Sequence, residues 1–226
     1  MARVPRPAAV PSPPRLPKQL DRTPAGDLHG QDRCVEVELT DVGFSDHRTD
    51  GLRLDTIKLT RVDLSGSHLQ RVRVIDADLT DCNLANLDAR GADASRVAIA
   101  RSRLTGIELR DGSLADLTIT GCRVDLASFG SCRLARVTFD ECLMTESTFI
   151  DAELDAVRFH DCDLTRADFR GARLRRCEFR RTDLSQLEGV ADLRGAAIDW
   201  PTIVGLAGVW AGALGIAVLD DDQTSP

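Results

Sequence analysis

The stretch VRFHD CDLTR ADFRG ARLRR CEFRR, residues 157–181, decides the fold, because its hydrophobic residues recur at every fifth position. The third residue of each group of five is Phe or Leu, and the spacing holds from Cys34 to Leu184 with Thr49 as the single polar exception. Thirty of these thirty-one positions are therefore apolar. All seven phenylalanines fall in this row: Phe44, Phe129, Phe139, Phe149, Phe159, Phe169 and Phe179.

A second row, two positions earlier in each group, holds mostly small or β-branched residues. Six of the seven cysteines occupy it. Small side chains beside large ones are what a narrow, close-packed interior needs if both rows point inward. The second row includes Val62, Val72, Ala77, Cys82, Ala92, Val97, Cys122, Cys132, Cys142, Ala152, Cys162, Ala172 and Cys177.

A strict period of five excludes an amphipathic helix, whose period is 3.6, and an isolated strand, whose period is 2. It fits a square coil in which each group of five forms one side and turns one corner, so that four groups complete the coil. Residues four groups apart then stack, as Phe139, Phe159 and Phe179 would. About 7.75 such coils, roughly 4.8 Å apart, predict a solenoid roughly 37 Å long.

Three short segments, at residues 77–80, 82–85 and 167–170, resemble the consensus of the pentapeptide-repeat family. That consensus is Ala, then Asp or Asn, then Leu or Phe, then two free positions. The resemblance covers about 155 of the 226 residues. It implies an all-β solenoid, a right-handed quadrilateral parallel β-helix of about 7 to 8 coils with a C-terminal helical cap. Residues 190–219 also resemble the tail that follows the repeats in some members of the family.

Three segments are expected along the chain. Residues 1–31 contain most of the prolines and no long apolar run, which predicts a disordered, proline-rich tail without a secretory signal and favours a cytoplasmic protein. Residues 32–187 are expected to form the β-helix, and residues 188–226 its C-terminal cap. His47 and Thr49 stand in the inward rows and predict an irregular first coil or a corner loop.

The C-terminal segment is expected to contain a helix that closes the last coil. Asp199 is a candidate N-cap, and the helix would end near Leu214. Gly208 and Gly212 form a small-residue stripe that could join two copies of the chain. Residues 203–219 carry no charge, so membrane contact is an alternative that the many Gly and Ala residues and the polar flanks disfavour. The candidate dimerisation residues are Trp200, Ile203, Leu206, Gly208, Trp210, Gly212 and Leu214.

The search for chemistry predicts no catalytic site, no metal site and no cofactor. The sequence contains neither a Cys-x-x-Cys pair nor a phosphate-binding loop. The histidines occupy unrelated repeat positions, and no Ser/His/Asp set recurs on one side; they are His29, His47, His68 and His160. The cysteines are expected to be reduced and to act as small buried hydrophobes. The sequence therefore predicts a protein that is not an enzyme.

Two functions remain open. The first is a rigid surface that binds another protein of unknown identity, without direct contact to nucleic acid because the net charge is −7. The family resemblance implies the alternative, since some members resemble B-form DNA and bind DNA gyrase, giving quinolone resistance.

Charge limits the alternative of a DNA mimic. Residues 32–186 contain 28 acidic and 23 basic residues, a net charge of −5, whereas roughly 37 Å of duplex carries about 22 phosphate charges. Mimicry would therefore be confined to a local acidic patch. The candidate partner-binding patch is Asp140, Glu141, Glu146, Asp151, Glu153, Asp155, Asp161 and Asp163.

Overall fold

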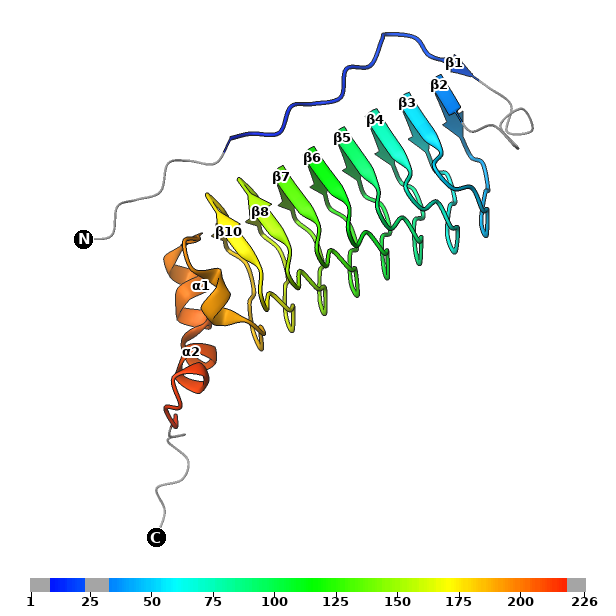
Figure 1. The fold of residues 1–226 in the computed structure, drawn as a ribbon. Helices are drawn as coiled ribbons and strands as arrows, with labels where there is room; N and C mark the ends of the chain where they lie inside the picture. The colour runs from blue at the N-terminus through cyan, green and yellow to red at the C-terminus, as the bar shows by residue number, and fades with distance from the viewer. Residues whose placement is uncertain (1–8, 23–32, 219–226) are drawn as a thin grey trace.

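The computed structural model describes residues 9–22 and 33–218, which form a single solenoid closed by short helices at its C-terminal end (Figure 1). The chain winds as a parallel β-helix of about eight turns, so the predicted fold class is confirmed. Its strands are β1 (Asp21–Arg22), β2 (Arg33–Thr40), β3 (Arg53–Thr60), β4 (Arg73–Thr80), β5 (Asp93–Ala100), β6 (Ser113–Thr120), β7 (Arg133–Asp140), β8 (Glu153–Asp155), β9 (Arg158–His160), β10 (Arg173–Arg175), β11 (Glu178–Arg180) and β12 (Ala197–Ile198). The helices are the 3-10 helix η2 (Val190–Leu193), α1 (Trp200–Gly205) and α2 (Ala207–Ala213).

Neighbouring coils pair in one register throughout the solenoid, with each residue opposite its equivalent four groups of five later. Leu54 lies opposite Val74 in the β3–β4 pair, and isolated bridges on the remaining sides keep the same spacing, as between Asp63 and Asn83. At this register every inward residue stacks on an inward residue of the next coil. Both hydrophobic rows are therefore buried in one continuous lumen.

Each coil has four faces, and each face ends in a corner. On the first to fourth faces of one coil, the outward residues that directly precede the inward central residue are Arg53, Lys58, Asp63 and His68. The residues that end its first to fourth corners are Thr56, Arg61, Gly66 and Arg71. Equivalent positions recur once in every coil.

The residue that ends each corner has a left-handed backbone. In the coil just named, the four φ angles are 58°, 53°, 66° and 54°. Gly, Asn and Asp adopt this conformation most readily, yet many corners carry Arg or Glu. Hydrogen bonds between coils offset the strain: the Arg61 amide donates to the Thr80 carbonyl at 3.0 Å, and the Asp81 amide to the Ala100 carbonyl at 3.1 Å. The turn is thus stabilised by stacking of the coils.

The lumen is packed differently in its two halves. In the C-terminal half, phenylalanine rings stack in two ladders with centroids 4.6 to 5.2 Å apart, and the ladders meet edge to face. The N-terminal half is lined by aliphatic side chains and retains a cavity of about 110 Å³. The two ladders are Phe129–Phe149–Phe169 and Phe139–Phe159–Phe179.

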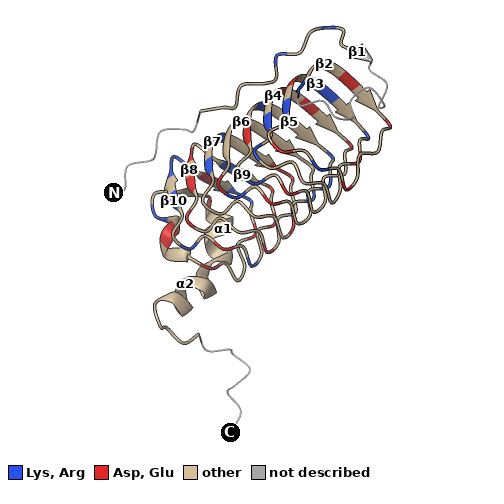
Figure 2. Cartoon of the chain, turned by 45° about the vertical axis from the view of Figure 1, so that its right-hand side comes forward, with Lys and Arg blue, Asp and Glu red and all other residues tan. Residues whose placement is uncertain are grey.

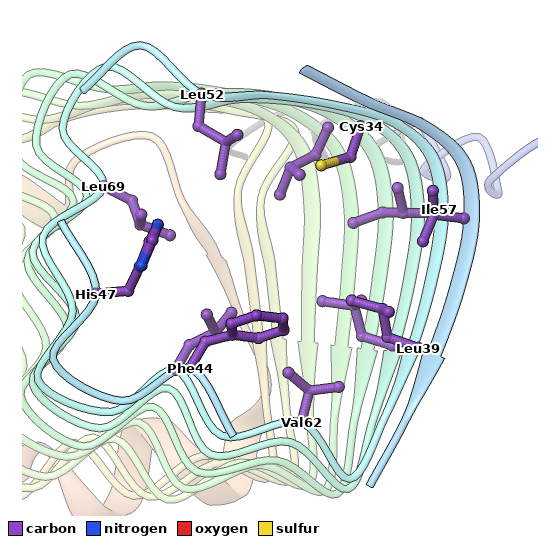
Figure 3. A pocket seen from close by; sticks show the side chains of 12 residues that line it. Cys34, Leu39, Phe44, His47, Leu52, Ile57, Val62 and Leu69 are labelled. Carbon is purple, nitrogen blue, oxygen red and sulfur yellow. The ribbon is translucent and has the colours of Figure 1, made fainter. Parts of the chain in front are cut away.

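The first coil is regular, so the expected irregularity around His47 and Thr49 is wrong. The Thr49 amide donates to the His68 carbonyl at 3.0 Å, as in later coils. The Thr49 hydroxyl and the His47 Nε2 atom lie 2.8 Å apart and hydrogen-bond to each other, which lets two polar residues occupy inward positions. Figure 3 shows His47 turned into the open mouth of the lumen opposite Leu39 and Ile57, where a cavity of about 70 Å³ lies.

Residues 9–22 lie along the outside of the solenoid. The Ser12 amide donates to Asp116 Oδ1 at 3.0 Å, the Arg15 amide donates to Asp76 Oδ1 at 2.9 Å, and β1 pairs in parallel with the edge of β2. Figure 1 shows this segment in dark blue, running along the length of the solenoid. The structure thus differs from the predicted disordered tail over residues 9–22, and residues 1–8 and 23–31 of that prediction lie outside the described residues.

The last coil is closed by the segment that follows Gly189. Gly189 has a φ of 75°, and a Cβ atom there would lie 2.4 Å from the backbone nitrogen of Arg170, so this position requires glycine. Beyond it, β12 pairs with β11 and covers the edge of the last coil. The predicted N-cap is confirmed, because the Asp199 side chain accepts from the Thr202 amide at 3.2 Å.

Candidate functional site

Outward side chains form columns along the solenoid, because equivalent positions of successive coils stack. At the first corner, Arg96 donates two hydrogen bonds of 2.7 Å to Asp76, and Arg136 donates bonds of 2.8 and 2.6 Å to Asp116. The second corner repeats the arrangement with Asp41–Arg61, Asp81–Arg101 and Asp161–Arg181. Figure 2 shows acidic and basic residues interleaved along the coils. Most corner charges are therefore neutralised locally.

The eight acids of the predicted patch do not gather on one side. Residues 140–163 are longer than one coil, so their side chains are distributed around the whole solenoid. Glu153 lies on the first face and Asp163 on the third, while Glu146 and Asp151 end the third and fourth corners. Asp155 lies at the first corner. The remaining three lie together at the second corner: Asp140, Glu141 and Asp161.

Arginines neutralise half of these acids. Glu146 pairs with Arg166 at 3.2 Å, and Asp161 accepts two bonds of 2.5 Å from Arg181. Glu153 and Asp155 each contact two arginines: the pairs are Glu153–Arg133, Glu153–Arg173, Asp155–Arg175 and Asp155–Arg176. Within the described residues, no Lys or Arg lies within ion-pair distance of Asp140, Glu141, Asp151 or Asp163.

A hollow on the third face and third corner brings apolar and charged groups together. Its volume is about 430 Å³ and three successive coils contribute to it. Asp125 organises its floor, accepting from Arg123 Nε at 2.7 Å and from the Thr145 hydroxyl at 2.7 Å. We call it the third-face hollow, and its residues are Arg103, Thr105, Arg123, Asp125, Leu126, Thr145 and Glu146.

Two exposed leucines distinguish this surface. Leu126 ends the third corner with a φ of 57°, and 57% of its surface is exposed. The same column carries Asp46, Gly66, Asn86 and Gly106 in earlier coils but Glu146, Arg166 and Gln186 in later ones, so Leu126 differs from its column in being a large hydrophobic residue. A left-handed backbone at a residue other than glycine costs roughly 1–2 kcal/mol. Leu143, 48% exposed, bridges Arg123 on the neighbouring coil. Both a strained backbone and exposed apolar area are unfavourable for the isolated chain.

Two polar groups of the hollow have no partner in the described part of the chain. The Thr105 hydroxyl oxygen is buried and has no hydrogen-bond partner within the described part of the chain. Arg103 likewise has no ion-pair partner among the residues that the structure describes. Sequence reasoning missed this site, although leucines at outward repeat positions such as 126 and 143 were a signal that could have found it.

The C-terminal end carries a second exposed apolar surface. The predicted helix is interrupted at Leu206, giving α1 and α2, and Leu206 is fully buried against the last coil. Trp200, 75% exposed, and Leu214 face outward. A Cβ atom at Gly208 or Gly212 would meet nothing within 4 Å, so their stripe is uncovered.

The other two residues predicted for dimerisation, Ile203 and Trp210, are half-buried and line a shallow groove of about 400 Å³ beside η2. This groove lies between the cap helices and the segment that follows the last coil. In the described part of the chain, no helix reaches the length and hydrophobicity needed to cross a membrane.

The cysteines are buried free thiols. All seven are unbridged, and six of them donate an S–H group to a backbone carbonyl, as Cys132 does to Leu109. Burial raises the pKa of the Cys122, Cys132 and Cys177 thiols to about 11. Within residues 9–22 and 33–218, no cluster of three His, Cys, Asp or Glu residues could hold a metal ion.

The histidines are placed separately. His47 lies in the lumen mouth and His68 lies 3.5 Å from Asp88 on the fourth face. His160 lies at the second corner with Nε2 3.7 Å from Glu178, and burial lowers its pKa. The fourth, His29, is outside the described residues.

Comparisons with known proteins agree with the repeat. Family models match residues 57–93, as "Pentapeptide repeats (8 copies)", and residues 120–188, as "Pentapeptide repeat region". The comparison with curated proteins gave no match. The chain is similar to full-length QnrB1, a plasmid-mediated fluoroquinolone resistance protein, at 20% identity and a TM-score of 0.46, over 81% of this chain and 90% of that one.

Two further solved structures are more distant. One is HetL of Nostoc sp. strain PCC 7120, involved in heterocyst differentiation regulation, with 16% identity, a TM-score of 0.20 and coverage of 73% and 88%. The other is a pentapeptide repeat protein from the thylakoid lumen of Arabidopsis thaliana, with 19% identity, a TM-score of 0.23 and coverage of 68% and 77%. From the matched repeats and the coil that they form, the chain belongs to the pentapeptide-repeat family.

Proposed function

We propose that the chain is a rigid, non-enzymatic binding surface for another protein, and that the third-face hollow is where the partner docks. The exposed, left-handed Leu126 carries this proposal. Among the described corner residues Leu126 is the one large hydrophobic side chain, and its exposed apolar area is better explained by a contact it makes with a partner.

The chemistry of the hollow defines the partner's complementary surface. Leu126 offers apolar area in the hollow, Leu143 adds exposed apolar area on the same face, and Arg103 offers a cation. A partner segment with an apolar side chain next to a carboxylate would satisfy all of these groups. Because the coil fixes every one of these positions, binding would require little ordering of this chain.

Affinity capture with matched variants tests the proposal. Immobilised wild-type chain should retain a protein from lysate of the source cells, and Leu126→Asp or Arg103→Glu should reduce its recovery at least tenfold. Ser113→Asp is the control, because Ser113 is an exposed residue on the first face of the same coil. Equal recovery by Leu126→Asp and Ser113→Asp would overturn the assignment of the hollow.

The gyrase-directed DNA mimic is the alternative, and the geometry gives it less support. The candidate acids surround the coil, and arginines neutralise Glu146, Glu153, Asp155 and Asp161. The patch that this alternative would use is the second corner, where Asp140 and Glu141 stand without an ion pair within the described residues. Inhibition of gyrase supercoiling that disappears in Asp140→Asn/Glu141→Gln would support the mimic over the hollow.

Homodimerisation through the C-terminal end completes the proposal. Trp200, Leu214 and the stripe of Gly208 and Gly212 leave apolar surface uncovered on α1 and α2. A second copy would cover this surface. Sedimentation equilibrium should show a dimer for the wild type and a monomer for Gly208→Glu/Gly212→Glu; a wild-type monomer at high concentration would contradict this part.

A further inference from the structure

The first corner holds the N-terminal segment in a fixed register. The Ser12 amide donates to Asp116 and the Arg15 amide donates to Asp76. These two carboxylates are two coils apart, and the two amides are three residues apart. Pro11 and Pro14, again three residues apart, are half-buried, while Ser12, Pro13 and Arg15 are exposed. Over residues 11–15 the contacts therefore recur every three residues, while beyond them Leu16 is half-buried and Pro17 is exposed.

This period matches the polyproline II conformation. A polyproline II helix has three residues per turn and rises roughly 3.1 Å per residue, so one turn advances roughly 9.3 Å. Two coils of the solenoid advance roughly 9.6 Å at the spacing of parallel strands. Residues 11–17, with the sequence PSPPRLP, are rich in the residue that favours this conformation. One polyproline II turn of the segment would therefore advance about as far as two coils of the solenoid.

The charge order of the first corner has the same period. Its column reads Asp76, Arg96, Asp116 and Arg136 in successive coils, so an acceptor carboxylate recurs every second coil. Each arginine holds its carboxylate with two hydrogen bonds of 2.6 to 2.8 Å, which fixes the direction in which the oxygens point. The carboxylates of Asp76 and Asp116 are therefore about as far apart as two backbone amides that are one turn apart in a polyproline II helix.

The outward column that precedes the first corner carries small residues in the coils around Asp116. Ser95, Ala115 and Ala135 are the residues that precede the corner in β5, β6 and β7, and all three are half-buried. In the coils on either side this column carries the larger Ile75 and Asp155. Small residues at these positions leave room for an extended chain to approach Asp116, whereas Asp76 is preceded in its coil by Ile75.

We propose that the first corner is a docking site for a proline-rich peptide in the polyproline II conformation, and that residues 9–22 of the chain occupy it in cis. A proline-rich segment of another protein reaches the site by displacing residues 9–22. Because the cis segment belongs to the same chain as the site, its binding is intramolecular, with an effective concentration on the order of millimolar. A proline-rich ligand from another protein must compete with this effective concentration, so ligands that bind weakly do not displace residues 9–22.

Nuclear magnetic resonance of the full chain tests the proposal. The chain is labelled with ¹⁵N, and exchange of the Ser12 and Arg15 amides with solvent is compared with random-coil rates. We expect at least tenfold protection in the wild type. Unlabelled peptide with the sequence of residues 9–22 is then added up to several millimolar, and the two resonances should move to random-coil positions in a saturable way. The same peptide with its four prolines changed to alanine should act at least tenfold more weakly.

Matched variants separate the docking site from a general effect on folding. Asp76→Ala/Asp116→Ala should abolish the protection without peptide, and Asp76→Asn/Asp116→Asn, which keeps the acceptor oxygens, should retain it. Asp81→Ala is the control, because Asp81 forms the same type of pair with Arg101 at the second corner. Random-coil exchange in the wild type, protection unchanged in the double alanine variant, or no displacement by the proline-containing peptide would each overturn the proposal.

Discussion

The ring of Phe149 lies face to face with the ring of Phe169, with centroids 4.6 Å apart and planes inclined by 15°, although a full coil of the chain separates them in sequence. Phe149 is fully buried and also stacks on Phe129. Phe149→Ala should lower the free energy of unfolding by about 3–5 kcal/mol, and Phe149→Asp should prevent folding because it buries an unpaired charge. Urea denaturation followed by circular dichroism measures both, and an unchanged midpoint would contradict the inward row.

The left-handed corner at Leu126 predicts that stability and binding respond in opposite directions. Leu126→Asn should leave stability unchanged or raise it by up to about 1 kcal/mol, because asparagine tolerates this backbone better than leucine. The same change should weaken partner binding, since it removes exposed apolar area. Thermal unfolding provides the first measurement; a clear loss of stability would show that Leu126 is kept for folding.

The Asp116 carboxylate predicts a stability loss in acid. The hydrogen bonds from Arg136 and from the Ser12 amide lower its pKa to about 2, while Arg96 adds a favourable charge. The ordinary unfolded value is about 3.9, so the folded state binds fewer protons and this stabilisation is fully present above that value. It should be lost as the pH falls from about 4 through 2.

Comparison with Asp116→Asn isolates this contribution. Urea unfolding at pH 6, 4, 3 and 2 should show a stability difference between wild type and variant of at most about 2 kcal/mol that shrinks over this range. A difference that stays constant down to pH 2 would show that the Asp116–Arg136 pair does not shift the titration.

The buried thiols predict slow chemical modification. The raised pKa values of Cys122, Cys132 and Cys177, about 11, leave little thiolate at pH 8. In the native chain, a thiol reagent should react at least a hundredfold more slowly than with free cysteine. After unfolding in denaturant all seven thiols should react; fewer than seven in fresh protein would mean that disulfides had formed.

The sequence was sufficient for the solenoid because a buried row leaves a strict period. The ladder from Phe129 to Phe169 and the N-cap at Asp199 both follow from local rules of spacing and capping. Outward positions follow no such rule. Residues 140–163 are a dense acidic run in sequence, yet the winding of the coil carries them around all sides, and arginines of neighbouring coils neutralise several of them.

Two features could not be predicted because they depend on contacts between distant residues. Proline-rich residues 9–22 are indistinguishable from a free tail until Asp76 and Asp116 are seen two coils apart at the same corner. The polarity of His47 and Thr49 predicts a disruption, yet the two side chains satisfy each other inside the lumen. The left-handed backbone of Leu126 could not be predicted either, because the five-residue pattern does not restrict which residue type stands at a corner.

The most direct test of the account is site-specific photocrosslinking from the third-face hollow. A photoreactive phenylalanine analogue is placed at position 126 in one variant and at the exposed position 113 of the same coil in a matched variant. The account predicts a discrete crosslinked adduct with one partner protein from position 126 and none from position 113. Adducts from neither position, or from position 113 alone, would contradict binding at the third-face hollow.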